Sequence, residues 1–168
     1  MSPRLRAFAG LLVLPLPAAG VAAPVTRSAT AEAAILSPLS VIKRADLDFG
    51  TIVVSGAGTA VVDPVSGSLT TTGSVTKAGA TAHPALFTST GSKNAVVHIR
   101  LPTNSITVTR VGGTETMTVG TWTLDGLANR KIPSNTTFDF AVGATLNVNA
   151  NQVPGTYRGT FTVTVQYP

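Results

Sequence analysis

Apolar and polar residues alternate along most of the chain after about residue 40, most regularly in the last segment. One side of that segment carries Tyr157, Gly159, Phe161, Val163, Val165 and Tyr167. The other side carries Arg158, Thr160, Thr162, Thr164 and Gln166. Because successive side chains of a strand point to opposite faces, this spacing predicts a strand with one buried face. A shift of one residue would exchange the two faces, so the register of this strand is strongly specified.

Two other segments alternate in the same way. In one, Ala144, Leu146, Val148 and Ala150 oppose Thr145, Asn147 and Asn149; in the other, Val97, Ile99 and Leu101 oppose Val96, His98 and Arg100. Further strands are predicted at 41–47, 51–54, 59–63, 68–72, 85–90, 106–111, 115–124 and 137–142. Turn residues separate them at short intervals, and no segment keeps a helical period.

Half-buried alternation of this kind is typical of antiparallel strands, since buried parallel strands read as continuous apolar runs. The pattern therefore predicts an all-β fold, namely an immunoglobulin-like antiparallel β-sandwich of about eight to ten strands. Trp122 is expected to lie in its core.

The first 22 residues have the features of a secretory signal peptide. Arg4 and Arg6 precede an apolar run at 7–14, and prolines and small residues follow it. We expect cleavage after Ala22, with Ala23 and Ala31 as alternative sites. The apolar run is too short to cross the roughly 30 Å hydrocarbon core, which disfavours an uncleaved anchor. We expect an exported chain, in the periplasm, at the cell surface or outside the cell, with no membrane span after cleavage.

Residues 23–39 are rich in Ala, Ser, Thr and Pro and are predicted to form a flexible lead-in to a single domain at 40–168. Within and just after it, Ile35, Leu39 and Val41 fall on one side of an extended chain. The lead-in is therefore a candidate donor strand.

Composition limits the chemistry that the chain offers. Charged residues make up 11%, against about 25% in an average soluble protein. The chain has no cysteine, which excludes disulfides, thiol nucleophiles and cysteine zinc sites, and it has only two histidines. Losing Arg4 and Arg6 lowers the formal net charge from +5 to +3, and the remaining basic residues are scattered. We expect no nucleic-acid partner, because that would need a clustered basic face.

Ser74 and Lys77 fit the Ser-x-x-Lys pattern of penicillin-binding enzymes. That chemistry needs a helix, which brings the lysine back to the serine; on a strand, positions three apart face opposite ways. The sequence around them favours a strand. The glycines at 56–58 lack the strand–helix context of a phosphate loop and predict a hairpin turn.

Asp46 and Asp48 alternate and would project to one side, within reach of a hard cation such as calcium. Few other acids are present, so a solvated strand face is the favoured interpretation.

Neither His83 nor His98 has a second metal ligand or a catalytic partner at the sequence spacing that such sites use. Both histidines are expected at the surface. Asn135 opens an Asn-x-Thr sequon, which matters only in a host that glycosylates exported proteins. We expect no catalytic residue, no metal site and no cofactor.

Gly155 is the fourteenth residue from the end and Tyr167 the second to last, with alternating apolar residues between them. This arrangement resembles the C-terminal signature of chaperone–usher pilus subunits. The resemblance implies an incomplete immunoglobulin-like sandwich, completed first by a periplasmic chaperone and then by the N-terminal strand of the next subunit at an outer-membrane usher. The assembly residues it implies are Gly155, Tyr157, Phe161, Val163, Val165 and Tyr167, and the donor residues are Ile35, Leu39 and Val41.

Four short motifs, at residues 45–52, 84–87, 142–146 and 154–161, occur in order along the mature chain. They resemble a family of secreted bacterial proteins known only as domain of unknown function 4402, and the first and last also resemble spore-coat-U-like subunits of archaic pili. The resemblance implies an exported β-sandwich that assembles at a surface, and it brings no catalytic residues. Many pilus subunits carry a disulfide, which this chain lacks.

The leading hypothesis is therefore a surface-associated, fimbrial-type structural subunit that assembles with copies of itself by strand addition, and not an enzyme. The alternative is a monomeric secreted binding module for carbohydrate or another surface ligand. That role would require an exposed aromatic platform, for which Trp122 is the candidate. An exported enzyme comes third and would need His83 or His98 in a cleft against a buried carboxylate.

Overall fold

The computed structural model describes residues 27–79 and 81–168. The predicted signal peptide at 1–22 and the predicted cleavage sites after Ala22 and Ala23 lie outside the described residues. The chain divides into two units, Met1–Ala34 and Ile35–Pro168. In the first unit, the described residues 27–34 are exposed and belong to no helix or strand.

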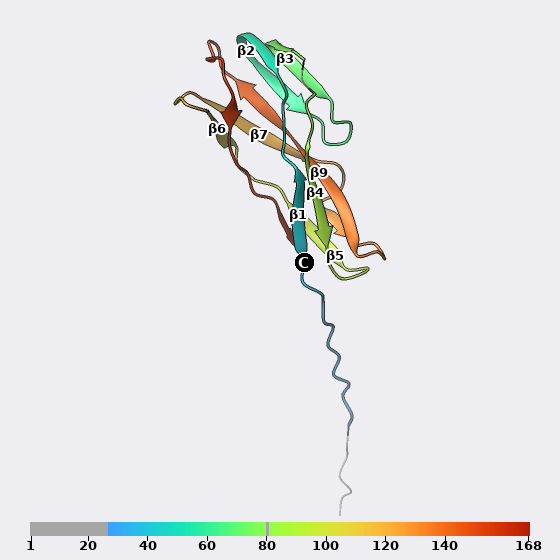
Figure 1. Cartoon of the computed structure of the whole chain (residues 1–168). Helices are drawn as coiled ribbons and strands as arrows, with labels where there is room; N and C mark the ends of the chain where they lie inside the picture. Colours follow the sequence, from blue (N-terminus) through green and yellow to red (C-terminus); the bar gives the residue numbers. More distant parts are fainter. Residues whose placement is uncertain (1–26, 80) are drawn as a thin grey trace, which may run out of the picture. The chain divides into compact units, whose positions relative to one another are not determined.

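The second unit is built from antiparallel strands, which confirms the all-β prediction (Figure 1). Its eleven strands are β1 (Ser40–Ala45), β2 (Ile52–Val62), β3 (Leu69–Lys77), β4 (Ala85–Thr90), β5 (Val96–Arg100), β6 (Ile106–Arg110), β7 (Thr116–Leu124), β8 (Asn129–Lys131), β9 (Thr137–Val148), β10 (Tyr157–Arg158) and β11 (Thr164–Gln166). Across 27–79 and 81–168 we find no helix with the length and apolar character needed to cross a membrane.

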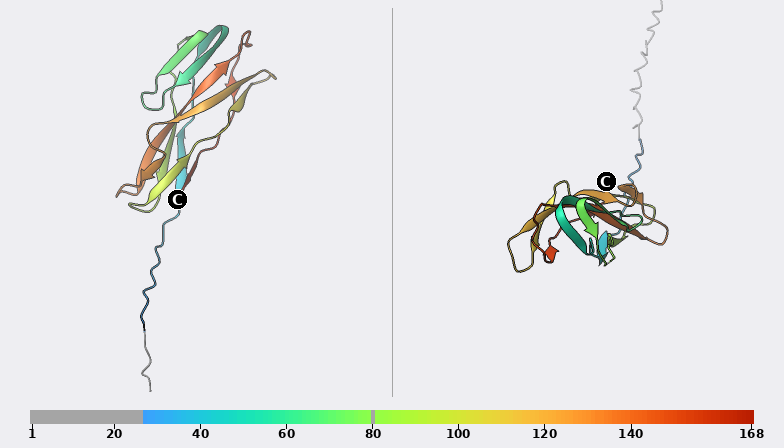
Figure 2. Two further views of the ribbon diagram at one scale, coloured as in Figure 1. Left: turned by 180° about the vertical axis from the view of Figure 1, so that it is seen from behind. Right: turned by 90° about the horizontal axis from the view of Figure 1, so that it is seen from above.

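The strands form two sheets that pack as a β-sandwich (Figure 2). The large sheet has the order β1-β4-β9-β7-β6-β10, and the β2–β3 hairpin joins it through pairing of β2 with β9. The small sheet has the order β11-β5-β8. The hairpin lies at the far end of the domain from the C-terminus, which ends beside the start of β1 (Figure 1).

Two apolar clusters fill the interior. In the first, Phe140 and Val142 of the large sheet pack with Ile99 of the small sheet, so both layers contribute. The second is built around Val119, Leu146 and Val148 of the large sheet, and no described residue of the small sheet belongs to it. Residues of the β1–β2 connection and the first residues of β2 and β10 pack on it instead, namely Leu47, Phe49, Ile52 and Tyr157. The small sheet thus covers only part of the large sheet.

The closing segment keeps the predicted alternation but not the predicted continuity. Phe161, Val163 and Val165 are half-buried against the first cluster, while the intervening threonines are exposed. The segment pairs with the large sheet through β10 and with the small sheet through β11. Between these strands, Gly159–Val163 belong to no assigned strand of the described chain. This segment therefore passes from one layer to the other.

Several details of the predicted layout need correction. Gly56 and Gly58 lie inside β2 and do not form a hairpin turn. There the β2–β3 register shifts between Val54 and Gly58, and a Cβ on Gly58 would lie 2.2 Å from the Thr72 carbonyl oxygen. Glycine thus permits a bulge and a close approach of two backbones. The segments predicted at 137–142 and 144–150 merge in β9, and the three-residue β8 was not predicted.

Candidate functional site

A groove of about 1290 Å³ opens over the part of the large sheet that the small sheet leaves uncovered. One wall is the segment 45–52, which joins β1 to β2, and the other is the segment 155–161 around β10. Its floor is apolar and consists of Ala85, Phe87, Ile106, Val108, Met117, Val119, Trp122 and Leu146. These residues come from β4, β6, β7 and β9. We refer to this feature as the open groove.

The first wall has an unpaired backbone edge. Asp48 N donates to His83 O at 2.9 Å, and His83 N donates to Asp48 O at the same distance, so this side of residue 48 is paired with the segment that leads into β4. Neighbouring residues of an extended chain direct their N–H and C=O groups to opposite sides. The backbone groups of Leu47 and Phe49 therefore face the groove, where they have no strand partner among the described residues.

The second wall repeats this arrangement. Thr156 O accepts from Val111 N at 2.8 Å, and Arg158 is in register with Thr109 of β6. By the same alternation, the backbone groups of Tyr157 and Gly159 point away from β6 and toward the groove. The open groove is therefore bordered by two backbone edges, with an apolar floor between them.

Side chains on both walls follow the two-residue period. Ala45, Leu47 and Phe49 are half-buried toward the floor on the first wall, and Tyr157 and Phe161 are half-buried on the second. The ionisable side chains that line the groove are exposed: Lys43, Asp46, Asp48, His83 and Arg158. Lys43 pairs with Asp46 at 2.5 Å, and the His83 Nε2–Asp48 Oδ2 distance is 4.0 Å with both side chains exposed.

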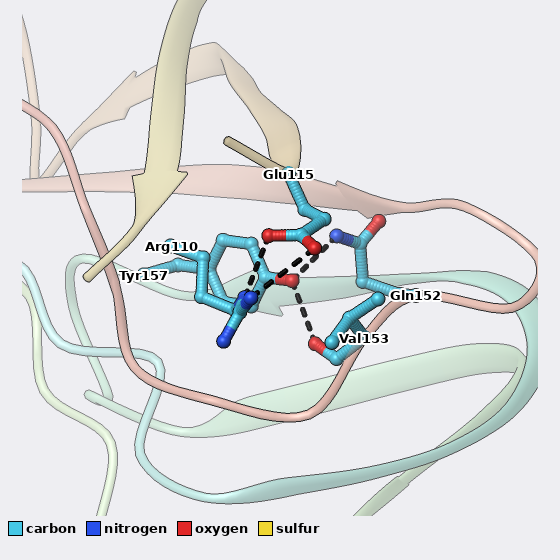
Figure 3. A network of polar contacts seen from close by, with 5 residues as sticks. All are labelled: Arg110, Glu115, Gln152, Val153 and Tyr157. Carbon is cyan, nitrogen blue, oxygen red and sulfur yellow. Dashed lines mark hydrogen bonds and ion pairs between the residues drawn. The ribbon is translucent and has the colours of Figure 1, made fainter. Parts of the chain in front are cut away.

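A polar network holds the second wall at its Tyr157 end (Figure 3). Arg110 Nε donates to Glu115 Oε2 at 2.6 Å and Nη2 donates to Oε1 at 3.2 Å, a two-pronged ion pair across the β6–β7 turn. The hydrogen bond from Arg110 lowers the pKa of Glu115 to about 2, and the same bond raises the pKa of Arg110. The Tyr157 hydroxyl donates to Val153 O at 2.6 Å and accepts from Gln152 Nε2 at 2.7 Å.

Gly155 begins this wall at a position where a side chain would be crowded. Its φ is +152°, and a Cβ would lie 2.8 Å from Cδ of Arg110. A larger residue here would require the arginine stem to shift and would adopt an unfavourable φ, so glycine is favoured at this position. The glycine that the sequence assigned to assembly has a local structural role as well.

The candidate donor residues are separated in the structure. Ile35 is 95% exposed, whereas Leu39 is half-buried. Val41 lies in β1 and is in register with Ser89 of β4. Because β1 already completes the edge of its own sheet, Val41 is not available for donation while that pairing lasts.

The remaining assembly residues lie along the closing segment. Val163 and Val165 pack on the first apolar cluster. The hydroxyl of Tyr167 donates to Ser37 O and accepts from Ser92 N, both at 2.8 Å.

The residues considered for chemistry are not brought together. Ser74 and Lys77 are both exposed on β3, and no hydrogen bond joins them in the described chain. His98 Nδ1 lies 2.6 Å from Asn129 Oδ1, a cross-strand contact of the small sheet. Within 27–79 and 81–168, no three His, Cys, Asp or Glu side chains are grouped as metal ligands would be.

Trp122 lies on the floor of the groove and is half-buried. Its Nε1 donates to Asn104 O at 3.1 Å, and its ring packs on Phe161 with centroids 4.6 Å apart. The N–H edge of the indole is thus hydrogen-bonded, and its ring packs against Phe161. A carbohydrate module would instead require an exposed aromatic ring.

The resemblance to pilus subunits implied an incomplete sandwich with a groove or an unpaired edge, but the sequence predicted neither the floor of this groove nor the Arg110–Glu115 pair. A usable signal for the pair is present, since opposite charges flank the Gly112-Gly113 turn of a hairpin. The floor of the groove has no such local signal, because its residues look like ordinary core positions of four separate strands.

The comparisons with known proteins give one match. Nothing among curated proteins or solved structures matches the chain significantly. A family described as Domain of unknown function (DUF4402) matches residues 39–167, which is most of the chain and nearly all of the second unit. The chain therefore belongs to the DUF4402 family.

Proposed function

We propose that this protein is an exported, surface-associated structural subunit of the fimbrial type, which assembles by β-strand addition. The observation that carries the proposal is the open groove, with one unpaired backbone edge on each wall. In this view the domain is an immunoglobulin-like sandwich that lacks one strand. A periplasmic chaperone and an outer-membrane usher would be the partners during assembly.

An extended strand is the occupant that suits such a groove best. Main-chain hydrogen bonds to both walls would give it affinity, and its alternate side chains would cover the apolar floor. A groove of 1290 Å³ also exceeds the roughly 300–1,000 Å³ of ordinary small-molecule pockets.

The segment 27–36 of a second copy is the donor we propose. Ala29, Ala31, Ala33 and Ile35 fall on one side of it when extended, and Ser28, Thr30 and Glu32 fall on the other. Its ten residues would extend over about 33 Å, whereas the seven residues of a wall such as 46–52 extend over about 23 Å. The donor thus shifts toward the N-terminus from the residues that the sequence first indicated, since Val41 is already paired in β1.

Size-exclusion chromatography of the full chain and two substituted chains tests this proposal. Ile35→Asp would place a charge on the side that faces the floor, so we expect it to reduce the polymer fraction strongly. Leu36→Asp is the matched control, because the neighbouring side chain would face solvent and polymers should persist. A full chain that stays monomeric would contradict the proposal and favour the monomeric binding module.

A further inference from the structure

The start of β1 is held by a hydrogen-bonded cluster at the end of the domain where the chain terminates. The Tyr167 hydroxyl bridges Ser37 O and Ser92 N, at 2.8 Å each. Ser37 N donates to Ser92 Oγ at 2.5 Å, so both backbone groups of Ser37 are engaged. We call Ser37, Ser92 and Tyr167 the Tyr167 latch.

Strand β1 itself has little side-chain burial to hold it in place. Five of its six residues are exposed, with Val41 at 38% and Ile42 at 57%. It pairs only with β4, so it is an edge strand. Its retention therefore depends on the backbone ladder and on contacts at its ends, because exposed edge strands open at low free energy.

Packing around the latch leaves no spare volume. Gly91 is buried, and a Cβ there would lie 2.7 Å from Leu39 Cδ2, 2.7 Å from Ile132 Cδ1 and 2.8 Å from the Tyr167 hydroxyl oxygen. Leu39 is thus seated beside the latch on its own domain. The chain before Ser37 has no such contact: Ile35 is 95% exposed and Leu36 is 48% exposed.

We infer that the Tyr167 latch sets the boundary between the part of the N-terminal segment that can be donated and the part that stays. Residues before Ser37 are free to enter the groove of a second copy, while Leu39 and β1 stay on their own domain. Tyr167 acts here as a positioning residue for a segment 130 positions away in the sequence. The inference rests on the proposed strand addition, but the latch itself is a property of the monomer.

Hydrogen exchange measured on the full chain tests the latch. Tyr167→Phe removes both hydroxyl bonds and keeps the ring, and Tyr157→Phe is the matched control because it removes two hydroxyl bonds at the other end of the same segment. Loss of two hydrogen bonds at an edge should speed exchange of 37–43 about tenfold. Exchange in β9 should stay unchanged in both variants. Ser92→Ala, which removes the acceptor of Ser37 N, should act in the same direction as Tyr167→Phe.

Polymers supply the second measurement. We expect wild-type polymers to gain protection at 27–36 and to keep the protection of β1 and β4, whereas Tyr167→Phe polymers lose protection in β4 as β1 leaves it. Unchanged exchange at 37–43 in the Tyr167→Phe monomer would overturn the latch, as would release of β1 in wild-type polymers. A full chain that stays monomeric would instead contradict strand addition and, with it, the donor boundary. Hydrogen exchange of the monomer would still show whether the latch exists.

Discussion

The ring of Phe161 packs against the indole of Trp122, with centroids 4.6 Å apart and planes tilted by 32°. Phe161 also meets Phe87 edge to face at 6.5 Å. Trp122 contacts both apolar clusters, so this pair fixes the closing segment over the junction between the closed half of the sandwich and the open groove.

Phe161→Ala should therefore destabilise the domain although Phe161 lies in no assigned strand. A fully buried Phe→Ala change costs about 3–5 kcal/mol, and half-burial reduces the expected loss to about 2–3 kcal/mol in the free energy of unfolding. Urea denaturation measures it, with Thr162→Ala on the exposed face as the control, expected within about 0.5 kcal/mol of wild type. Equal effects of the two substitutions would show that the segment does not pack as described.

Much of the layout follows from two-residue alternation. The alternation at 96–101 and 144–150 predicted the buried faces of β5 and β9, where Val97, Ile99, Leu146 and Val148 are buried. The closing segment was predicted as one strand, but it divides between two sheets. Alternation fixes which side chains turn inward, and it carries no information about which neighbour a strand pairs with.

Glu115→Gln should alter how stability depends on pH. The folded-state pKa of Glu115 is lowered from 4.5 to about 2, so its pairing with Arg110 stabilises the fold above pH 4.5 and is lost as the pH falls toward 2. Urea midpoints at about pH 5 and about pH 2.5 should drop more for wild type than for the variant. Parallel losses in the two proteins would mean that this pair does not contribute.

Gly155→Ala should destabilise the start of the second wall, by about 1–2 kcal/mol, because a Cβ would meet the Arg110 stem. The reason is tested by a double-mutant cycle with Arg110→Ala, which removes the obstructing atoms. We expect Gly155→Ala to cost less in that background. If the cost is the same in both backgrounds, backbone conformation alone explains the glycine.

The candidate site was harder to predict from the sequence than the fold was. The alternation placed Tyr157, Phe161 and Tyr167 on one side of the segment, yet Trp122, which packs on Phe161, and Ser37, which Tyr167 bonds, are distant in the sequence and leave no local pattern. The groove exists because the three-stranded small sheet covers only part of the large one, which depends on strand pairing across the whole domain. Gly155, the alternation around it, and the motifs at 45–52 and 154–161 pointed to the two walls of the groove.

The most direct measurement is a titration of a synthetic peptide of residues 27–36 into the chain lacking those residues, followed by amide hydrogen exchange. If the open groove accepts an extended strand, the amides of Leu47, Phe49, Tyr157 and Gly159 on the two walls should be protected, and the fluorescence of Trp122 on the floor should change. A peptide with Ile35→Asp should do neither. Absence of binding up to about 1 mM, or binding that leaves both walls unprotected, would contradict the proposal that this groove is completed by a strand.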